Sequence, residues 1–140
     1  MMTNLMRALI FSVCAAIAMT SSAATKDDDR LKLDCADPVN SGRHVVKETV
    51  GPIYVSGADD SQLKTAAAAM DSFVTGAAYC QMELQSRPEK VSGDLIAEWR
   101  SLNQWLNRLA DRLDSSVMDP NNLGWRDEYS LFAEVYEFEP

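Results

Sequence analysis

The segment 119–124, with the sequence DPNNLG, resembles the first half of a calcium-binding loop. An EF-hand loop of this type places oxygen ligands at its first, third and fifth positions, a glycine at its sixth and a glutamate at its twelfth. Here the fifth position is Leu123 and the twelfth is Ser130, so two of the required ligands are missing. We therefore interpret the segment as a turn-rich loop and expect no bound metal.

Catalysis by histidine has one candidate in this chain, His44. A serine or cysteine nucleophile needs a base beside it, and a lone histidine is usually structural or exposed. A haem-binding bundle would use core methionine or histidine ligands, but Met70 falls on an apolar helix face, where methionine usually serves packing. Paired carboxylates could support glycoside hydrolysis, although a sugar-binding cleft is hard to build on so small a helical domain. The sequence predicts neither an enzyme nor a cofactor.

The first 23 residues have the pattern of a secretory signal peptide. Arg7 gives a basic start, an apolar run of about a dozen residues follows, and small residues precede the expected cleavage after Ala23 or Ala24. The apolar run is shorter than the ~20 residues that span a bilayer. We therefore expect a periplasmic or secreted mature chain, a single domain of residues 24–140.

Two cysteines, Cys35 and Cys80, remain once the predicted signal peptide and its Cys14 are removed. In an oxidising compartment, two cysteines most simply form one disulfide bond. A zinc site would need further ligands at set spacing, and the chain has no C-x-x-C pair. The sequence therefore predicts a Cys35–Cys80 disulfide.

The mature chain is strongly acidic, with 12 basic and 21 acidic residues and a formal net charge of −9. Nucleic acids and anionic membranes are bound mainly through basic residues. The charge therefore argues against both, and favours either a merely soluble surface or a basic protein partner.

Apolar residues recur at helical spacing in three segments of the mature chain. The first runs from a capping box at Asp59 and Gln62 to just before Arg87-Pro88, and the second from an N-cap at Ser92 to about residue 113. A third helix is predicted over about 126–136, followed by an extended tail. Joined by a short connection, the two long helices should pack antiparallel.

The remaining segments are less regular. Residues 24–30 should form a mobile terminus. Residues 44–56 suit a short helix that ends at Gly51-Pro52, with a hairpin between 44–50 and 53–56 as the alternative. Residues 114–124 are predicted to form an eleven-residue loop. The fold class is therefore all-α, a small bundle of three to four helices with one disulfide.

The function that we expect from the sequence is protein binding. Loops of this length are often functional, and aromatic residues commonly anchor interfaces. The predicted partner-binding residues are Asp119, Asn121, Asn122, Trp125 and Tyr129.

In size, predicted compartment and charge the chain is similar to immunity proteins that neutralise toxins or peptidoglycan-degrading effectors, a likeness of class rather than of motif. The alternative is a periplasmic chaperone that exposes apolar surface in acid. Self-association into a homodimer is left open.

Overall fold

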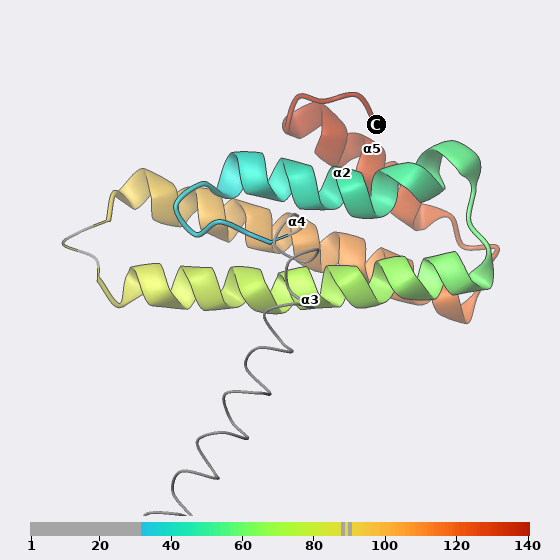
Figure 1. The fold of residues 1–140 in the computed structure, drawn as a ribbon, viewed down its shortest axis with the longest axis horizontal. Helices are drawn as coiled ribbons and strands as arrows, with labels where there is room; N and C mark the ends of the chain where they lie inside the picture. The colour runs from blue at the N-terminus through green and yellow to red at the C-terminus, as the bar shows by residue number, and fades with distance from the viewer. Residues whose placement is uncertain (1–31, 88, 90) are drawn as a thin grey trace, which may run out of the picture. The chain divides into compact units, whose positions relative to one another are not determined.

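A computed structural model describes residues 32–140 except 88 and 90. This part of the chain forms four α-helices and no strand (Figure 1). Their bounds are Pro38–Ser56 (α2), Asp60–Gln85 (α3), Gly93–Met118 (α4) and Gly124–Val135 (α5). The predicted all-α bundle is confirmed, whereas the predicted signal peptide and mobile terminus lie outside the described residues.

Helix α2 is longer than the sequence predicted. It begins at Pro38, because Asp37 caps it by accepting a hydrogen bond from the Asn40 amide at 3.2 Å, and proline is well tolerated in a first turn. It also continues through Pro52, so the predicted end at Gly51-Pro52 is wrong. Pro52 lies in the last turn, and burial of Ile53 beyond it offsets the lost hydrogen bond.

The hairpin alternative for residues 44–56 is also excluded, because the whole segment is helical. Three valines of this segment, Val45, Val46 and Val50, are fully buried in the core.

Helices α3 and α4 form the long antiparallel pair that the periodicity predicted (Figure 1). The capping box is present: the Asp59 carboxylate accepts from the Gln62 amide at 2.8 Å, and the Gln62 side chain accepts from the Asp59 amide at 3.0 Å. Ser92 caps α4 by accepting from the Leu95 amide at 3.2 Å. Both helices therefore begin where their capping residues indicated.

The predicted disulfide joins Cys35, just before α2, to Cys80 on α3, with 5.2 Å between the two Cα atoms. Cys80 is buried on the core face of α3. The indole Nε1 of buried Trp99 on α4 donates to the Cys35 carbonyl at 2.7 Å. The N-terminal segment is thus attached to both long helices.

Helix α4 extends to Met118, so the predicted loop over 114–124 is shortened to residues 119–123. The reason is Ser116, which continues the buried row of Leu109 and Leu113 and lies in the core with 1% of its surface exposed. Serine is common in turns, but the small side chain of Ser116 also fits in the core as part of α4.

Helix α5 packs on α4 and α2 and carries the aromatic part of the core. The rings of Phe132 and Tyr136 stack with centroids 4.3 Å apart, and Trp105 meets Phe132 edge-on at 6.0 Å. Beyond the helix, Phe138 folds back against Phe132 at 5.9 Å rather than extending away as predicted.

Candidate binding surface

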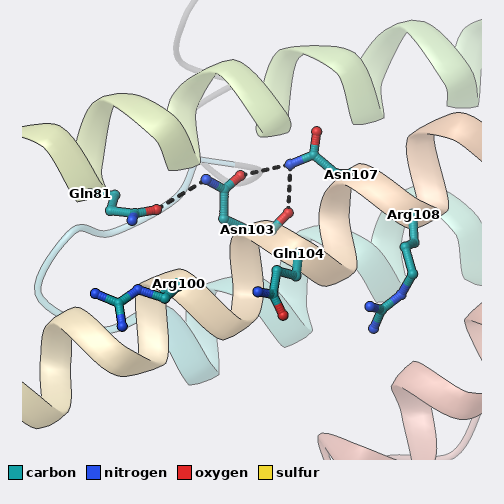
Figure 2. A pocket seen from close by; sticks show the side chains of 6 residues that line it. All are labelled: Gln81, Arg100, Asn103, Gln104, Asn107 and Arg108. Carbon is teal, nitrogen blue, oxygen red and sulfur yellow. Dashed lines mark hydrogen bonds between the residues drawn. The ribbon is translucent and has the colours of Figure 1, made fainter.

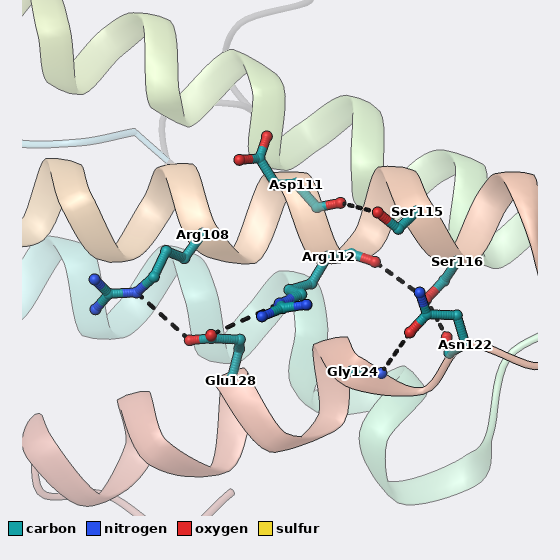
Figure 3. A network of polar contacts seen from close by, with 8 residues as sticks. All are labelled: Arg108, Asp111, Arg112, Ser115, Ser116, Asn122, Gly124 and Glu128. Atoms are coloured by element: carbon teal, nitrogen blue, oxygen red, sulfur yellow. Dashed lines mark hydrogen bonds and ion pairs between the residues drawn. The ribbon is translucent and has the colours of Figure 1, made fainter.

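The turn between α4 and α5 is internally hydrogen-bonded. Asp119 accepts twice, through Oδ1 from the Asn121 amide at 3.1 Å and through its carbonyl from the Asn122 amide at 2.9 Å. Asn122 in turn accepts through Oδ1 from the Gly124 amide at 3.1 Å. The buried Ser116 hydroxyl lies within hydrogen-bonding distance of the Asn122 and Arg112 carbonyls (Figure 3). These contacts hold the turn in one conformation, and the Asn122 side chain takes part in them.

The structure places two of the predicted partner-binding residues in the core. Trp125 is 2% exposed and Tyr129 is fully buried, so neither ring is accessible to a partner in this conformation. Both lie on the buried row of α5 that continues with Phe132 and Tyr136. An aromatic at every third or fourth helical position fills a small core as readily as it anchors an interface, and here packing against α2 and α4 decides the outcome.

Burial has a measurable consequence for Tyr129. Its hydroxyl has no hydrogen-bond partner among the described residues. Desolvation, assisted by the nearby Tyr54 and Glu48, raises the pKa of Tyr129 to about 12. Because the ring of Tyr54 lies 5.1 Å away on α2, this tyrosine belongs to the α2–α5 interface and is no candidate catalytic group.

The exposed residues around the turn include Asp119, Asn121 and two apolar side chains that were not among the predicted partner-binding residues. Met118 is 87% exposed and Leu123 is 57% exposed. Leu123 begins a row along the outer face of α5 that continues at every fourth residue with Asp127, Leu131 and Val135.

In that row Leu131 and Val135 are 50% and 58% exposed, and the exposed residues Ser130 and Glu134 lie beside them. We name this surface the α5 outer face; it comprises Leu123, Asp127, Ser130, Leu131, Glu134 and Val135. The signal for it was present in the sequence, since these residues form the face opposite the aromatic row.

Arg126 is the one basic side chain of α5, and it is directed towards Tyr54 rather than towards this face. Arg126 donates to the Tyr54 carbonyl at 3.0 Å and its guanidinium lies 4.4 Å from the centre of the Tyr54 ring. Glu128 lies between Arg108 and Arg112 of α4, at 3.6 Å and 3.8 Å from their Nε atoms (Figure 3). The α5 outer face is therefore left acidic and apolar.

The described residues contain neither a cluster of metal-ligating side chains nor a candidate membrane-spanning helix. No three histidine, cysteine, aspartate or glutamate side chains in this part of the chain are close enough to hold a metal ion. None of its helices combines the length and apolar character needed to cross a membrane.

Comparison with known proteins gives no relationship: neither a protein-family model, nor a curated protein, nor a solved structure matches the chain. We therefore infer the function from the exposed residues of the α4–α5 turn and the α5 outer face.

Proposed function

We propose that this protein is an exported inhibitor of the immunity type, which binds a basic toxin or peptidoglycan-degrading effector and covers its active site. The observation that carries the proposal is the α5 outer face, where exposed Leu123, Leu131 and Val135 alternate with the carboxylates of Asp127 and Glu134. The adjoining turn adds Asp119, Asn121 and the exposed Met118.

The composition of this face suits a basic protein partner. Protein interfaces combine an apolar centre with a polar rim, and carboxylates around that centre accelerate encounter with a basic surface and disfavour acidic ones. The row from residue 123 to 135 is about 18 Å long at 1.5 Å per residue. A standard interface buries about 800 Å² per partner, so the turn must contribute as well as the helix.

The scaffold supports a rigid mode of binding. The α4–α5 ion pairs and the hydrogen bonds within the turn hold both parts of the surface in place before a partner arrives. Ordering costs on association are then small, which favours tight inhibition.

The test uses site-specific photo-crosslinking in the producing cell. A photoreactive amino acid replaces Ser130 on the α5 outer face or, as the control, the exposed Thr75 on α3. Crosslinking to an exported hydrolase from position 130 but not from 75 supports the proposal. The purified hydrolase should then lose activity on peptidoglycan when this protein is added.

Variants assign the surface. Leu131→Ser with Val135→Ser, and separately Asp119→Ala with Asn121→Ala, should weaken hydrolase binding at least tenfold. Met82→Ser on α3 removes a comparably exposed apolar side chain, 66% exposed, and should change nothing. Equal hydrolase binding by the parent and by all of these variants would show that neither the α5 outer face nor the turn belongs to the interface.

A dye-binding series separates this proposal from the chaperone alternative. An inhibitor with a fixed surface should bind an apolar dye equally at pH 7 and pH 4. A sharp and reversible rise in dye binding at pH 4, with no crosslinked hydrolase, would favour the chaperone instead.

A further inference from the structure

A shallow hollow of about 440 Å³ lies on the outer side of α4 next to α3, away from the α5 outer face (Figure 2). Two arginines and four carboxamides line it, and no carboxylate does; the residues are Gln81, Arg100, Asn103, Gln104, Asn107 and Arg108. On a chain with a formal net charge of −8 this is a locally basic and amide-rich site.

Three of the carboxamides form an ordered chain across the α3–α4 boundary. Asn103 donates through Nδ2 to Gln81 Oε1 at 3.1 Å, and Asn107 donates through Nδ2 to the Asn103 carbonyl at 2.7 Å and to its Oδ1 at 2.9 Å (Figure 2). These bonds orient the amides but leave Gln81 Nε2 and Asn107 Oδ1 without a partner among the described residues. One donor and one acceptor are therefore available to a ligand.

The two arginines lie at either end of the site. Arg100 forms no ion pair within the described part of the chain, so its guanidinium is not neutralised there. Arg108 is held in place because its guanidinium lies 4.2 Å from the centre of the Trp105 ring and its Nε lies 3.6 Å from Glu128. No described hydrogen bond or ion pair uses its Nη1 or Nη2 atom.

The spacing of the arginines determines the shape of the ligand. They are eight residues apart on one helix, which is about 12 Å at 1.5 Å per residue. A ligand with two anionic groups can pair with both arginines at this separation. An extended peptide advances about 3.3–3.6 Å per residue, and side chains four positions apart point to the same side of it, so they span about this distance.

We propose that the hollow binds an extended acidic peptide segment whose two carboxylates, four positions apart, pair with Arg100 and Arg108. The guanidinium fork matches a carboxylate in geometry and charge. Between the arginines, the carboxamides of Gln81, Gln104 and Asn107 offer the donor and acceptor groups that a peptide backbone presents. The site is independent of the proposed inhibitor function, because it lies on α4 and requires no hydrolase.

The test titrates the full chain with a synthetic peptide that carries two glutamates four positions apart in a Gly/Ser background. Binding is followed by calorimetry and by tryptophan fluorescence, since Trp105 is partly exposed beside Arg108 whereas Trp99 and Trp125 are buried. We expect binding and a change in fluorescence. The same peptide with glutamines in place of glutamates should not bind.

Variants and a rival ligand complete the test. Arg100→Gln should weaken peptide binding about three- to fivefold, the scale of one exposed charge pair, and the double variant with Arg108→Gln should weaken it about ten- to twenty-five-fold. Lys64→Gln, which removes the same charge near the start of α3, should bind as the parent does.

Three results would overturn the proposal. They are no binding by the parent protein, equal binding by the Lys64 and Arg100 variants, or a clear preference for an acidic tetrasaccharide over the peptide. The last result would assign the hollow to an anionic glycan.

Discussion

Gly42 of α2 lies directly against Leu102 of α4, so closely that a Cβ atom on Gly42 would be 2.6 Å from Leu102 Cδ1 and 3.3 Å from its Cγ. Leu102 is fully buried, so moving its methyl groups would disturb the core side chains around it. A side chain at position 42 would therefore push α2 away from α4. The glycine is required by this approach of two helices, and the periodicity of the sequence does not reveal it.

Substitution of this glycine should destabilise the fold. We expect Gly42→Ala to lower the free energy of unfolding by about 1–3 kcal/mol, the usual cost of overpacking a core. Gly76→Ala is the matched control, because it also lies within a helix but its added Cβ would make an ordinary 3.7 Å contact with Leu33. That variant should gain up to ~1 kcal/mol from helix propensity. Urea denaturation measures both, and effects of the same sign would contradict this interpretation.

The disulfide should account for a large part of the stability. Cys35 and Cys80 close a loop with a sequence separation of 45, for which the chain-entropy estimate is about 4 kcal/mol and measured losses are typically about 2–4 kcal/mol. We expect the Cys35→Ser, Cys80→Ser variant to melt about 10–20 °C lower than the parent. Adding reductant should lower the parent's melting temperature and leave the variant unchanged. A parent that reductant does not affect, in denaturant as well as in buffer, would show that the bond is absent.

Local patterns made part of this structure predictable. The Asp59–Gln62 capping box, the Ser92 cap and the apolar rows of α3 and α4 are properties of short segments, and all were found where predicted. The disulfide followed from the number of remaining cysteines. These features do not depend on which helices pack together.

The sequence predictions were wrong where a residue type is common in two kinds of structure. Asp37-Pro38 suits a turn but here forms the cap and first residue of α2, and Ser116 suits a loop but is a buried residue of α4. Trp125 and Tyr129 suit an interface but fill the core, because α2 and α4 cover them. Which of the two structures forms depends on how segments that are distant in the sequence pack together. The residue pattern within one segment does not reveal that packing.

The buried hydroxyl of Tyr129 predicts a stabilising substitution. A buried polar group without a hydrogen bond costs about 1–3 kcal/mol, and this hydroxyl has no partner among the described residues. We therefore expect Tyr129→Phe to raise the free energy of unfolding at pH 7 by about 1 kcal/mol. A loss of stability would instead indicate that the hydroxyl is hydrogen-bonded.

The same tyrosine predicts how stability changes in alkali. Its pKa is raised from 10.0 to about 12 in the folded protein, so above pH 10 the unfolded chain loses this proton first. Stability present below pH 10 is then lost as the pH rises towards 12. Tyr129→Phe should make that loss smaller in urea titrations at successive pH values. Some loss should remain, because Tyr79 and Tyr136 also have raised pKa values.

Two carboxylates on facing helices, Asp71 of α3 and Asp114 of α4, predict a pH dependence of the same sign at acid pH. Desolvation, followed by the charges of Asp71 and Asp111, raises the pKa of Asp114. The folded protein therefore binds this proton more tightly than the unfolded chain does. Ionised Asp114 opposes folding at neutral pH, and this opposition disappears as the pH falls through the raised pKa.

Neutralising this carboxylate should therefore stabilise the protein at pH 7 only. Exposed charge pairs contribute about 0.2–1 kcal/mol, so we expect Asp114→Asn to raise the melting temperature by roughly 1–4 °C. At pH 3, where the parent is also protonated, the two should melt together. Glu139→Gln, which removes an exposed carboxylate from the tail, is the charge-matched control and should have little effect. A gain that persists at pH 3 would mean that the asparagine acts through packing and not through charge.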